Sequence, residues 1–393
     1  MNTIENLLLK INGQENCMNE SASQGCSDDL ASLWKNYTDR VKSEAPYVNV
    51  EDGGETIRLG SISRGCQACK SGSWDCIFLT LQCNLACSFC CSPANKNGNI
   101  PLSAVGETIA EVVTNYRLNQ PDGVSFSGGE PFLAFSNLIK NIKKVRKELP
   151  NTYIWIYTNG ILADREKLLM LNDSGVDEIR FNMAATGYQN AAVLKNVYNA
   201  SRILKNVTVE CPAVPAEESK LLKSLKSWEN VGVRYINLHE LMYEPGTPSS
   251  LLDWDKVGLV TPDGHKTYVH PESRITILNT MKLVHDAGLQ LSINECSLQN
   301  KIRQVRGRRE FIGRLLEKMP YATERLTDEN YLESICGISP EGRIFYLHPQ
   351  KLFLAMQKFP SYQFIRLWRV PPLTIRSGKD WLRFEIVSSG REG

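Results

Sequence analysis

The sequence predicts an α/β protein built on a parallel sheet, and three observations support this fold class. Six short runs rich in β-forming residues alternate with amphipathic helical stretches. Each run ends in a polar or glycine-rich turn before the next helical stretch begins. Repeated strand–helix–strand order requires parallel strands joined by right-handed crossovers. The expected strands lie at 77–81, 123–127, 153–157, 178–182, 207–211 and 235–241.

The helical stretches between and beyond these strands have apolar residues at helical spacing. The expected helices lie at 29–41, 103–116, 136–149, 163–174, 188–204, 217–229 and 272–287. A seventh strand is expected at 289–294, and the basic stretch 301–309 is expected to be a solvated helix face, or else a patch that faces an anionic substrate. After Arg343, three β-like runs joined by turn-prone residues predict a small antiparallel extension.

These elements divide the chain into three expected parts. Residues 1–65 form an N-terminal lead-in, residues 66–300 form the main α/β domain, and residues 301–393 form the C-terminal extension. The chain has 393 residues, with 42% hydrophobic and 22% charged residues, which is typical of a globular protein.

Charge and hydropathy exclude several classes of partner. The net charge of +2 gives no electrostatic reason to expect nucleic-acid or membrane binding. No apolar run reaches the length of a membrane span, and the short run Leu7-Leu8-Leu9 does not resemble a signal peptide. We therefore expect a cytoplasmic protein. Its twelve cysteines then indicate metal or redox chemistry rather than a disulfide framework.

Three of these cysteines form the most informative motif. Cys83, Cys87 and Cys90 stand in a C-x3-C-x2-C run after the first predicted strand, with Phe89 before the last cysteine. Three thiolates on one loop can ligate three irons of a [4Fe-4S] cluster and leave the fourth iron open to a ligand. A zinc site and a buried apolar cysteine cluster are the alternative interpretations.

At this spacing the sequence resembles the radical S-adenosylmethionine (radical SAM) enzymes. The resemblance covers roughly residues 66–241 and implies a partial (βα)6 barrel. In that superfamily SAM chelates the open iron, and one electron from the cluster splits SAM into methionine and a 5'-deoxyadenosyl radical. That radical takes a hydrogen atom from the substrate. The resemblance thus implies a [4Fe-4S] cluster, SAM, and an electron donor such as flavodoxin or ferredoxin.

Two strings after the second and third strands extend the resemblance. Ser127-Gly128-Gly129-Glu130-Pro131 resembles the motif that contacts the SAM amino group, where glycines permit close approach and carbonyls or a carboxylate accept hydrogen bonds. Tyr157-Thr158-Asn159-Gly160 resembles a string that lines the site beneath SAM. Asn182 resembles a polar residue that holds SAM, with loop capping as the alternative. The implied SAM-binding residues are Phe89, Gly128, Gly129, Glu130, Thr158, Asn159 and Asn182.

Polar residues also end the fifth and sixth strands, where parallel barrels place their chemistry. Because side chains alternate along a strand, only one of each adjacent pair can point inward. We expect Asn237 or Glu240, rather than His239, to face the substrate. The candidate catalytic residues are Glu210, Cys211, Asn237 and Glu240, with outward-facing side chains as the alternative.

A further set of cysteines suggests a second metal site. Cys66, Cys69 and Cys76 precede the triplet, and Cys336 stands in a Cys-Gly string that resembles the start of the auxiliary-cluster (SPASM or twitch) extensions. These four thiolates are the expected ligands of one auxiliary [4Fe-4S] cluster, with a zinc site or unliganded thiols as alternatives. No cysteine follows Cys336, so a complete SPASM domain with two clusters is excluded.

The sequence therefore predicts a radical SAM enzyme that acts on a small-molecule substrate. A peptide-modifying enzyme is the first alternative, because C-terminal extensions guide peptides in some relatives. A non-catalytic iron–sulfur or zinc module is the second, but it does not explain the strings at successive strand ends. Cys211 and Cys296 are expected to be core residues or hydrogen-atom donors to a product radical.

Overall fold

The computed structural model describes residues 25–90, 108–116, 120–243, 257–260, 266–319, 321–371 and 383–387. The chain divides into two compact units. One comprises Gly25–Gln304, and the described part of the other begins at Val305. The boundary falls within helix α10 (Leu298–Lys318).

The first unit is built on one large sheet, which confirms the predicted α/β class. The six strands β3 to β8 and strand β12 run parallel to their neighbours, and β1 and β2 continue the sheet antiparallel beyond β12. The strand order is β1 (Asn49–Glu51), β2 (Thr56–Leu59), β12 (Ser292–Cys296), β8 (Tyr235–Glu240), β7 (Asn206–Ala213), β6 (Glu178–Phe181), β5 (Tyr153–Thr158), β4 (Gly123–Gly128) and β3 (Trp74–Thr80).

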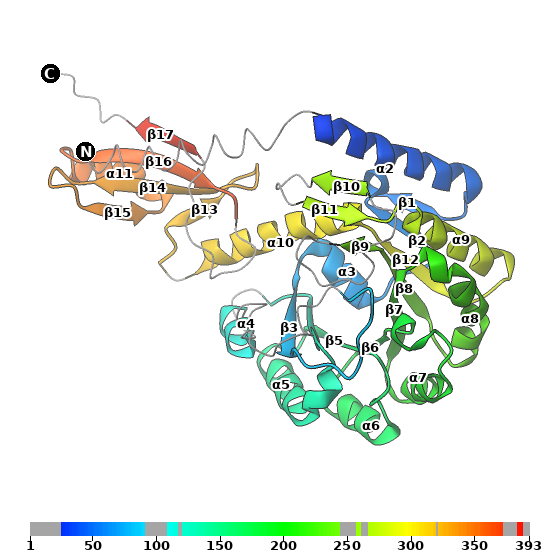
Figure 1. The fold of residues 1–393 in the computed structure, drawn as a ribbon. Helices are drawn as coiled ribbons and strands as arrows, with labels where there is room; N and C mark the ends of the chain where they lie inside the picture. The colour runs from blue at the N-terminus through cyan, green and yellow to red at the C-terminus, as the bar shows by residue number, and fades with distance from the viewer. Residues whose placement is uncertain are drawn as a thin grey trace. The chain divides into compact units, whose positions relative to one another are not determined.

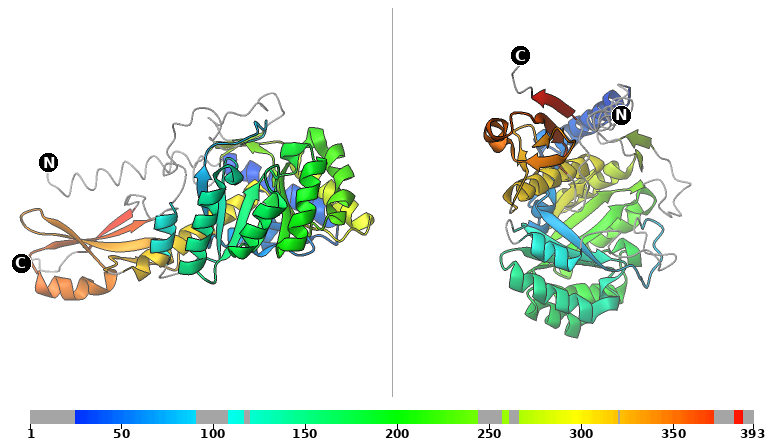
Figure 2. Two further views of the ribbon diagram at one scale, coloured as in Figure 1. Left: turned by 90° about the horizontal axis from the view of Figure 1, so that it is seen from below. Right: turned by 90° about the vertical axis from the view of Figure 1, so that its left-hand side faces the viewer.

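Crossover helices cover the outer face of this curved sheet (Figures 1 and 2). Their starts agree with the sequence signals: the Asp164 side chain caps one helix and the Asn190 side chain caps the next by accepting hydrogen bonds from backbone N–H groups. The helices are α4 (Ile109–Asn115), α5 (Phe135–Glu148), α6 (Arg165–Asp173), α7 (Ala191–Ile203), α8 (Glu218–Asn230) and α9 (Ser273–Asp286). Expected helix residues 103–107 lie outside the described part of the chain.

A short helix that the sequence analysis missed lies inside the curve of the strands. Figure 1 shows α3 (Arg64–Ser71) surrounded by β3 to β8. Gly65 permits this close packing, because a Cβ atom there would meet the Arg180 guanidinium and lie 3.3 Å from the Trp155 ring. Gly72, with φ 74°, ends the helix in the left-handed conformation that favours glycine.

The expected lead-in over 1–65 does not match the division of the structure. Residues from Gly25 onward belong to the first unit, because Leu59 of β2 pairs with Ile293 of β12. Helix α2 (Gly25–Glu44) also joins this unit: the Tyr37 hydroxyl donates a hydrogen bond of 2.8 Å to Glu295. A small antiparallel sheet of β9 (Met242–Tyr243), β10 (Val257–Val260) and β11 (Lys266–Val269) completes the described part of the unit.

The second unit contains the expected antiparallel strands and its own core. Ile365 and Leu367 of β16 pack with Cys336 and Ile338 of β14, and all four are buried. Its elements are β13 (Glu324–Leu326), β14 (Leu332–Ile338), β15 (Ile344–Leu347), α11 (Leu352–Lys358), β16 (Gln363–Arg369) and β17 (Arg383–Val387). Within the described residues of the whole chain, no helix has both the length and the apolar character that crossing a membrane requires.

Candidate active site at the carboxyl ends of the parallel strands

The three predicted cluster ligands lie on the loop that leaves β3. Cys83, Cys87 and Cys90 are all partly exposed, and the Cys90 N–H donates to the Cys87 carbonyl over 3.1 Å in a tight turn. Burial raises the pKa of the Cys87 thiol to about 11, and the neighbouring thiols of Cys90 and Cys83 add to this effect. The three sulfurs are therefore close enough to interact electrostatically.

The Gly128-Gly129 backbone fixes the start of this loop. The Gly129 N–H donates to the Thr80 carbonyl and the Glu130 N–H donates to the Gln82 carbonyl, each over 2.8 Å. A Cβ atom on Gly129 would overlap the Gln82 carbonyl oxygen, and one on Gly128 would overlap that of Thr80. The glycines are thus required for close packing of β4 on the residues just before Cys83, in addition to any approach of a ligand.

Glu130 joins two loops of the site. Its carboxylate is buried and accepts hydrogen bonds from the Thr158 hydroxyl (2.9 Å), the Asn159 N–H (2.8 Å) and the Phe132 N–H (3.1 Å). Burial raises its pKa above the usual value, while these three donors act in the opposite direction. In this arrangement the carboxylate holds the Thr158-Asn159-Gly160 turn against the glycine loop.

Asn159 extends the connection to the cysteine loop. Its Nδ2 donates to Oδ1 of Asn84, the residue after Cys83, over 2.7 Å. The Asn182 side chain accepts from the Ala185 N–H over 3.1 Å, which is the loop-capping geometry considered as its alternative. Phe89 is partly exposed. Asn84 was missed by the sequence analysis, although its place between two predicted ligands was a usable signal.

The donor set of the loop fits an iron–sulfur cluster. Thiolates are the usual ligands of such clusters, and three of them stand on one loop here. Among the described residues, no three His, Cys, Asp or Glu side chains converge on one point as a single metal ion requires. A cluster does not need such convergence, because each thiolate ligates a different iron.

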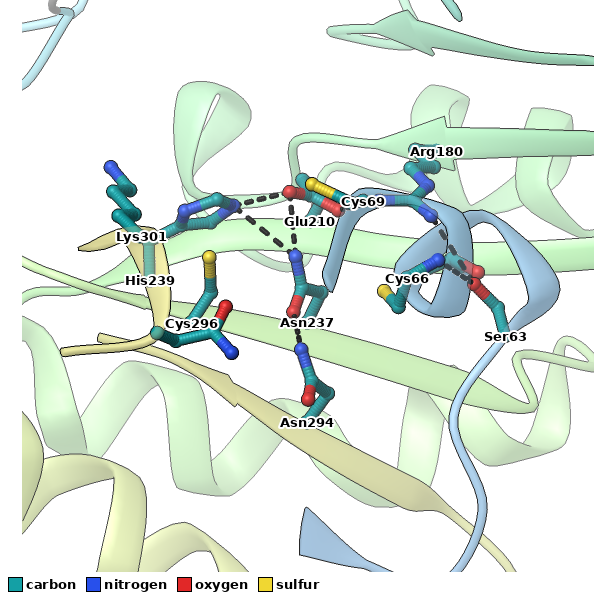
Figure 3. A network of polar contacts seen from close by, with 12 residues as sticks. Ser63, Cys66, Cys69, Arg180, Glu210, Asn237, His239, Asn294, Cys296 and Lys301 are labelled. Atoms are coloured by element: carbon teal, nitrogen blue, oxygen red, sulfur yellow. Dashed lines mark hydrogen bonds and ion pairs between the residues drawn. The ribbon is translucent and has the colours of Figure 1, made fainter. Parts of the chain in front are cut away.

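A polar network covers the inner face of β6, β7, β8 and β12 (Figure 3). Glu210 accepts from Arg180 Nη1 (2.9 Å) and Asn237 Nδ2 (2.8 Å), and it also contacts His239 Nε2. Although burial alone would raise the pKa of Glu210, Arg180 and His239 lower it to about 2. Burial alone would lower the pKa of His239, but Cys296 and Glu210 raise it to about 10. The network therefore holds Glu210 as a carboxylate and His239 as an imidazolium.

The structure agrees with the expectation for Asn237 and differs from it for Glu240 and His239. His239 shares the inner face with Asn237, whereas Glu240 faces the outer layer, where it accepts from the Leu298 N–H over 2.7 Å. Cys211 also lies on the outer face beside Tyr188 and is buried, and burial raises its pKa. Alternation along a strand does not show which of two adjacent side chains faces inward. The register of β7 with β8 does, because it pairs Glu210 with Asn237.

The four thiols expected to form an auxiliary cluster have different surroundings. Cys336 is fully buried in the apolar core of the second unit, and burial raises its pKa to about 11. Burial raises the pKa of Cys76 to about 12, an effect reduced by hydrogen bonds with Ser125 and Ser127 on the neighbouring strand. Cys66 and Cys69 lie on α3 and face a different thiol, Cys296. The proposed four-thiolate set therefore has no support in these surroundings.

The fold and the site agree with the match that a family model finds. A parallel, curved α/β sheet carries three thiols and two hydrogen-bonded loops at the carboxyl ends of neighbouring strands, which is an arrangement suited to binding a metal cofactor beside a ligand. Residues 77–213 match the family model described as the radical SAM superfamily. Enzymes of that superfamily use a [4Fe-4S] cluster and SAM.

Two curated relatives match parts of the chain. A Methanocaldococcus jannaschii protein, provisionally named a glycyl-radical enzyme activating enzyme, is 27% identical over 191 residues, which are 46% of this chain and 51% of that protein. The 7-carboxy-7-deazaguanine synthase of Methanospirillum hungatei is 33% identical over 85 residues, 21% of this chain and 33% of that enzyme. The chain thus spans about half of the first relative and a third of the second.

Solved structures also resemble parts of the chain. Methylornithine synthase is 14% identical with a TM-score of 0.40, covering 72% of this chain and 81% of that one. Streptococcus suis SuiB bound to S-adenosylmethionine is 13% identical with a TM-score of 0.40, covering 57% of this chain and 50% of that one.

Proposed function

We propose that the protein is a radical SAM enzyme that removes a hydrogen atom from a small-molecule substrate. The observation that supports this most directly is the cysteine loop itself. Three partly exposed thiols leave β3 within the segment that matches the superfamily, and the glycine loop of β4 fixes the position of the first of them. When bound, the cluster and SAM supply a 5'-deoxyadenosyl radical.

The residues of this chain have defined tasks in that proposal. Cys83, Cys87 and Cys90 hold the cluster. Glu130 fixes the Thr158-Asn159 turn, and Asn159 fixes Asn84 in the cysteine loop, so that the surface offered to SAM stays in one geometry. The outer helices close the barrel wall and limit the access of water to the interior.

The reducing partner and the location complete the proposal. A small electron carrier such as flavodoxin or ferredoxin would reduce the cluster, in the cytoplasm expected from the sequence.

The names of the two relatives suggest different kinds of substrate, a protein for one and a deazaguanine base for the other. The polar inner face formed by Glu210, Asn237 and His239 favours a small polar molecule over an apolar one.

Formation of 5'-deoxyadenosine tests the activity. We expect the anaerobically reconstituted and reduced protein to release 5'-deoxyadenosine from SAM, measured by mass spectrometry. Cys83→Ala should abolish the release, whereas Cys211→Ala, on the outer face of β7, should retain it. If wild type and Cys83→Ala release equal amounts, the proposal is wrong.

Deuterium transfer tests the substrate class. Deuterated metabolite fractions and deuterated peptide fractions from the host are supplied separately, and deuterium in 5'-deoxyadenosine is measured. Transfer from the metabolite fraction alone supports the small-molecule proposal. Transfer from the peptide fraction alone would assign the protein to the peptide-modifying enzymes instead.

A further inference from the structure

Helix α3 presents two thiols and one ammonium group on one face. Cys66, Cys69 and Lys70 stand at i, i+3 and i+4, so their side chains lie together on the helix surface. Cys66 and Lys70 are more than nine-tenths buried, with exposed fractions of 4% and 7%. The Ser63 side chain caps the helix at the Cys66 N–H and also accepts from Arg180, which fixes this end of α3 against the sheet.

A third thiol and an imidazole face this helix from the strand ends. Cys296, the last residue of β12, is the neighbour in register of His239, the last residue but one of β8. The Gln304 side chain accepts from the Cys69 thiol over 3.2 Å and donates to the Cys296 sulfur over 3.8 Å, so these two thiols flank a single amide group. Figure 3 shows Cys66 and Cys69 on α3 across from Asn237, His239 and Cys296.

Lys70 provides an independent indication of a missing anionic group. Its Nζ atom is buried and has no hydrogen-bond partner among the described residues. Lys70 directly follows Cys69 and lies one helical turn after Cys66, so its side chain leaves the helix beside both thiols. A buried ammonium group without a partner is costly, so a negatively charged centre beside it would be stabilising.

His239 lies beside these thiols but is not one of the ligands. Its Nε2 contacts the Glu210 carboxylate, which is itself held by Arg180 and Asn237. Figure 3 shows the other ring nitrogen on the side away from Cys66 and Cys69.

We propose that Cys66, Cys69 and Cys296 bind a second iron–sulfur cluster inside the barrel. Three thiolates on a dipositive cluster leave one negative charge, which the Lys70 ammonium group would balance. The Gln304 amide occupies the space between two of the thiols and must turn away when the cluster binds. This site is separate from the cysteine loop and does not depend on the proposed function.

The test removes the first cluster and counts what remains. The Cys83→Ala/Cys87→Ala/Cys90→Ala protein is reconstituted anaerobically with iron and sulfide, and iron, acid-labile sulfide and zinc are measured per chain. We expect this variant to retain about four irons with matching sulfide, roughly half of the wild-type content. Adding Cys69→Ser and Cys296→Ser should remove this iron, whereas adding Cys211→Ser instead, another buried thiol of the same sheet, should not.

A second variant keeps the test decisive if the combined variants fold poorly. Lys70→Met preserves the length and the apolar stem of the side chain but removes its charge. In the triple-alanine background we expect it to lower the retained iron severalfold while the circular dichroism spectrum stays unchanged. The proposal is overturned if the triple-alanine protein binds no iron with sulfide, if it binds zinc instead, or if its iron survives the loss of Cys69 and Cys296.

Discussion

Glu130 shows how a single residue can be assigned two different roles. The resemblance to radical SAM enzymes suggests a carboxylate that contacts the SAM amino group. The structure instead surrounds that carboxylate with three donors of the protein itself, from Phe132, Thr158 and Asn159. The two roles predict different behaviour of the protein when SAM is absent.

We expect Glu130→Ala to destabilise the protein even without SAM. The substitution leaves three buried donors without an acceptor, which should lower the free energy of unfolding by about 3 kcal/mol in a urea titration. Glu130→Gln keeps one carbonyl acceptor and should cost only about 1 kcal/mol. Unchanged stability of Glu130→Ala in the absence of SAM would mean that the carboxylate serves the ligand rather than the fold.

Glu210 should make stability depend on acid pH. Its pKa in the folded protein, about 2, lies below the ordinary value of 4.5, because Arg180 and His239 together outweigh the effect of burial. The resulting stabilisation is present above about pH 4.5 and is lost as the pH falls towards 2, since the unfolded chain then binds the proton more readily. The expected loss is about 3 kcal/mol. Urea unfolding of the metal-free protein at decreasing pH measures it, and Glu210→Gln should show a distinctly flatter pH dependence.

At the scale of elements, the repeated strands and crossover helices could be predicted because each has a clear periodicity and turn signals at its ends. Helix α3 could not, because its eight residues are fewer than the roughly 11–18 over which a helical period can be recognised. The directions of His239 and Glu240 also required the strand register. That register depends on contacts between distant segments, which a single sequence does not specify.

The placement of α3 inside the barrel gives a prediction about the sign of one substitution. Alanine in place of Gly65 would stabilise an exposed helix by about 1 kcal/mol. Here its Cβ atom would overlap the Arg180 guanidinium and lie 3.0 Å from Glu178 Oε2. We therefore expect Gly65→Ala to destabilise the protein by about 1–3 kcal/mol. A gain in stability in the same urea titration would contradict the packing of α3 against the inner face.

The whole molecule was only partly predictable, since the C-terminal extension was expected but the surroundings of its cysteine were not. The Cys336-Gly337 string resembles a metal motif, whereas the structure makes it part of a buried strand. In β14 every residue is buried, and Gly337 leaves room for the Phe345 ring. A buried cysteine in an apolar sheet and a cysteine ligand have the same letter in the sequence, and only the surrounding side chains distinguish them.

Two separate hydrophobic cores should produce two separate unfolding transitions. Ile365 is buried in the core of the second unit and Ile156 in that of the first, so each alanine substitution should remove about 2–4 kcal/mol from one unit only. Differential scanning calorimetry should therefore show that Ile365→Ala and Ile156→Ala lower different transition temperatures. Hydrogen exchange followed by mass spectrometry assigns each transition to its residues. If both variants shift one common transition, the two units fold as a single cooperative structure, and the division after Gln304 has no thermodynamic meaning.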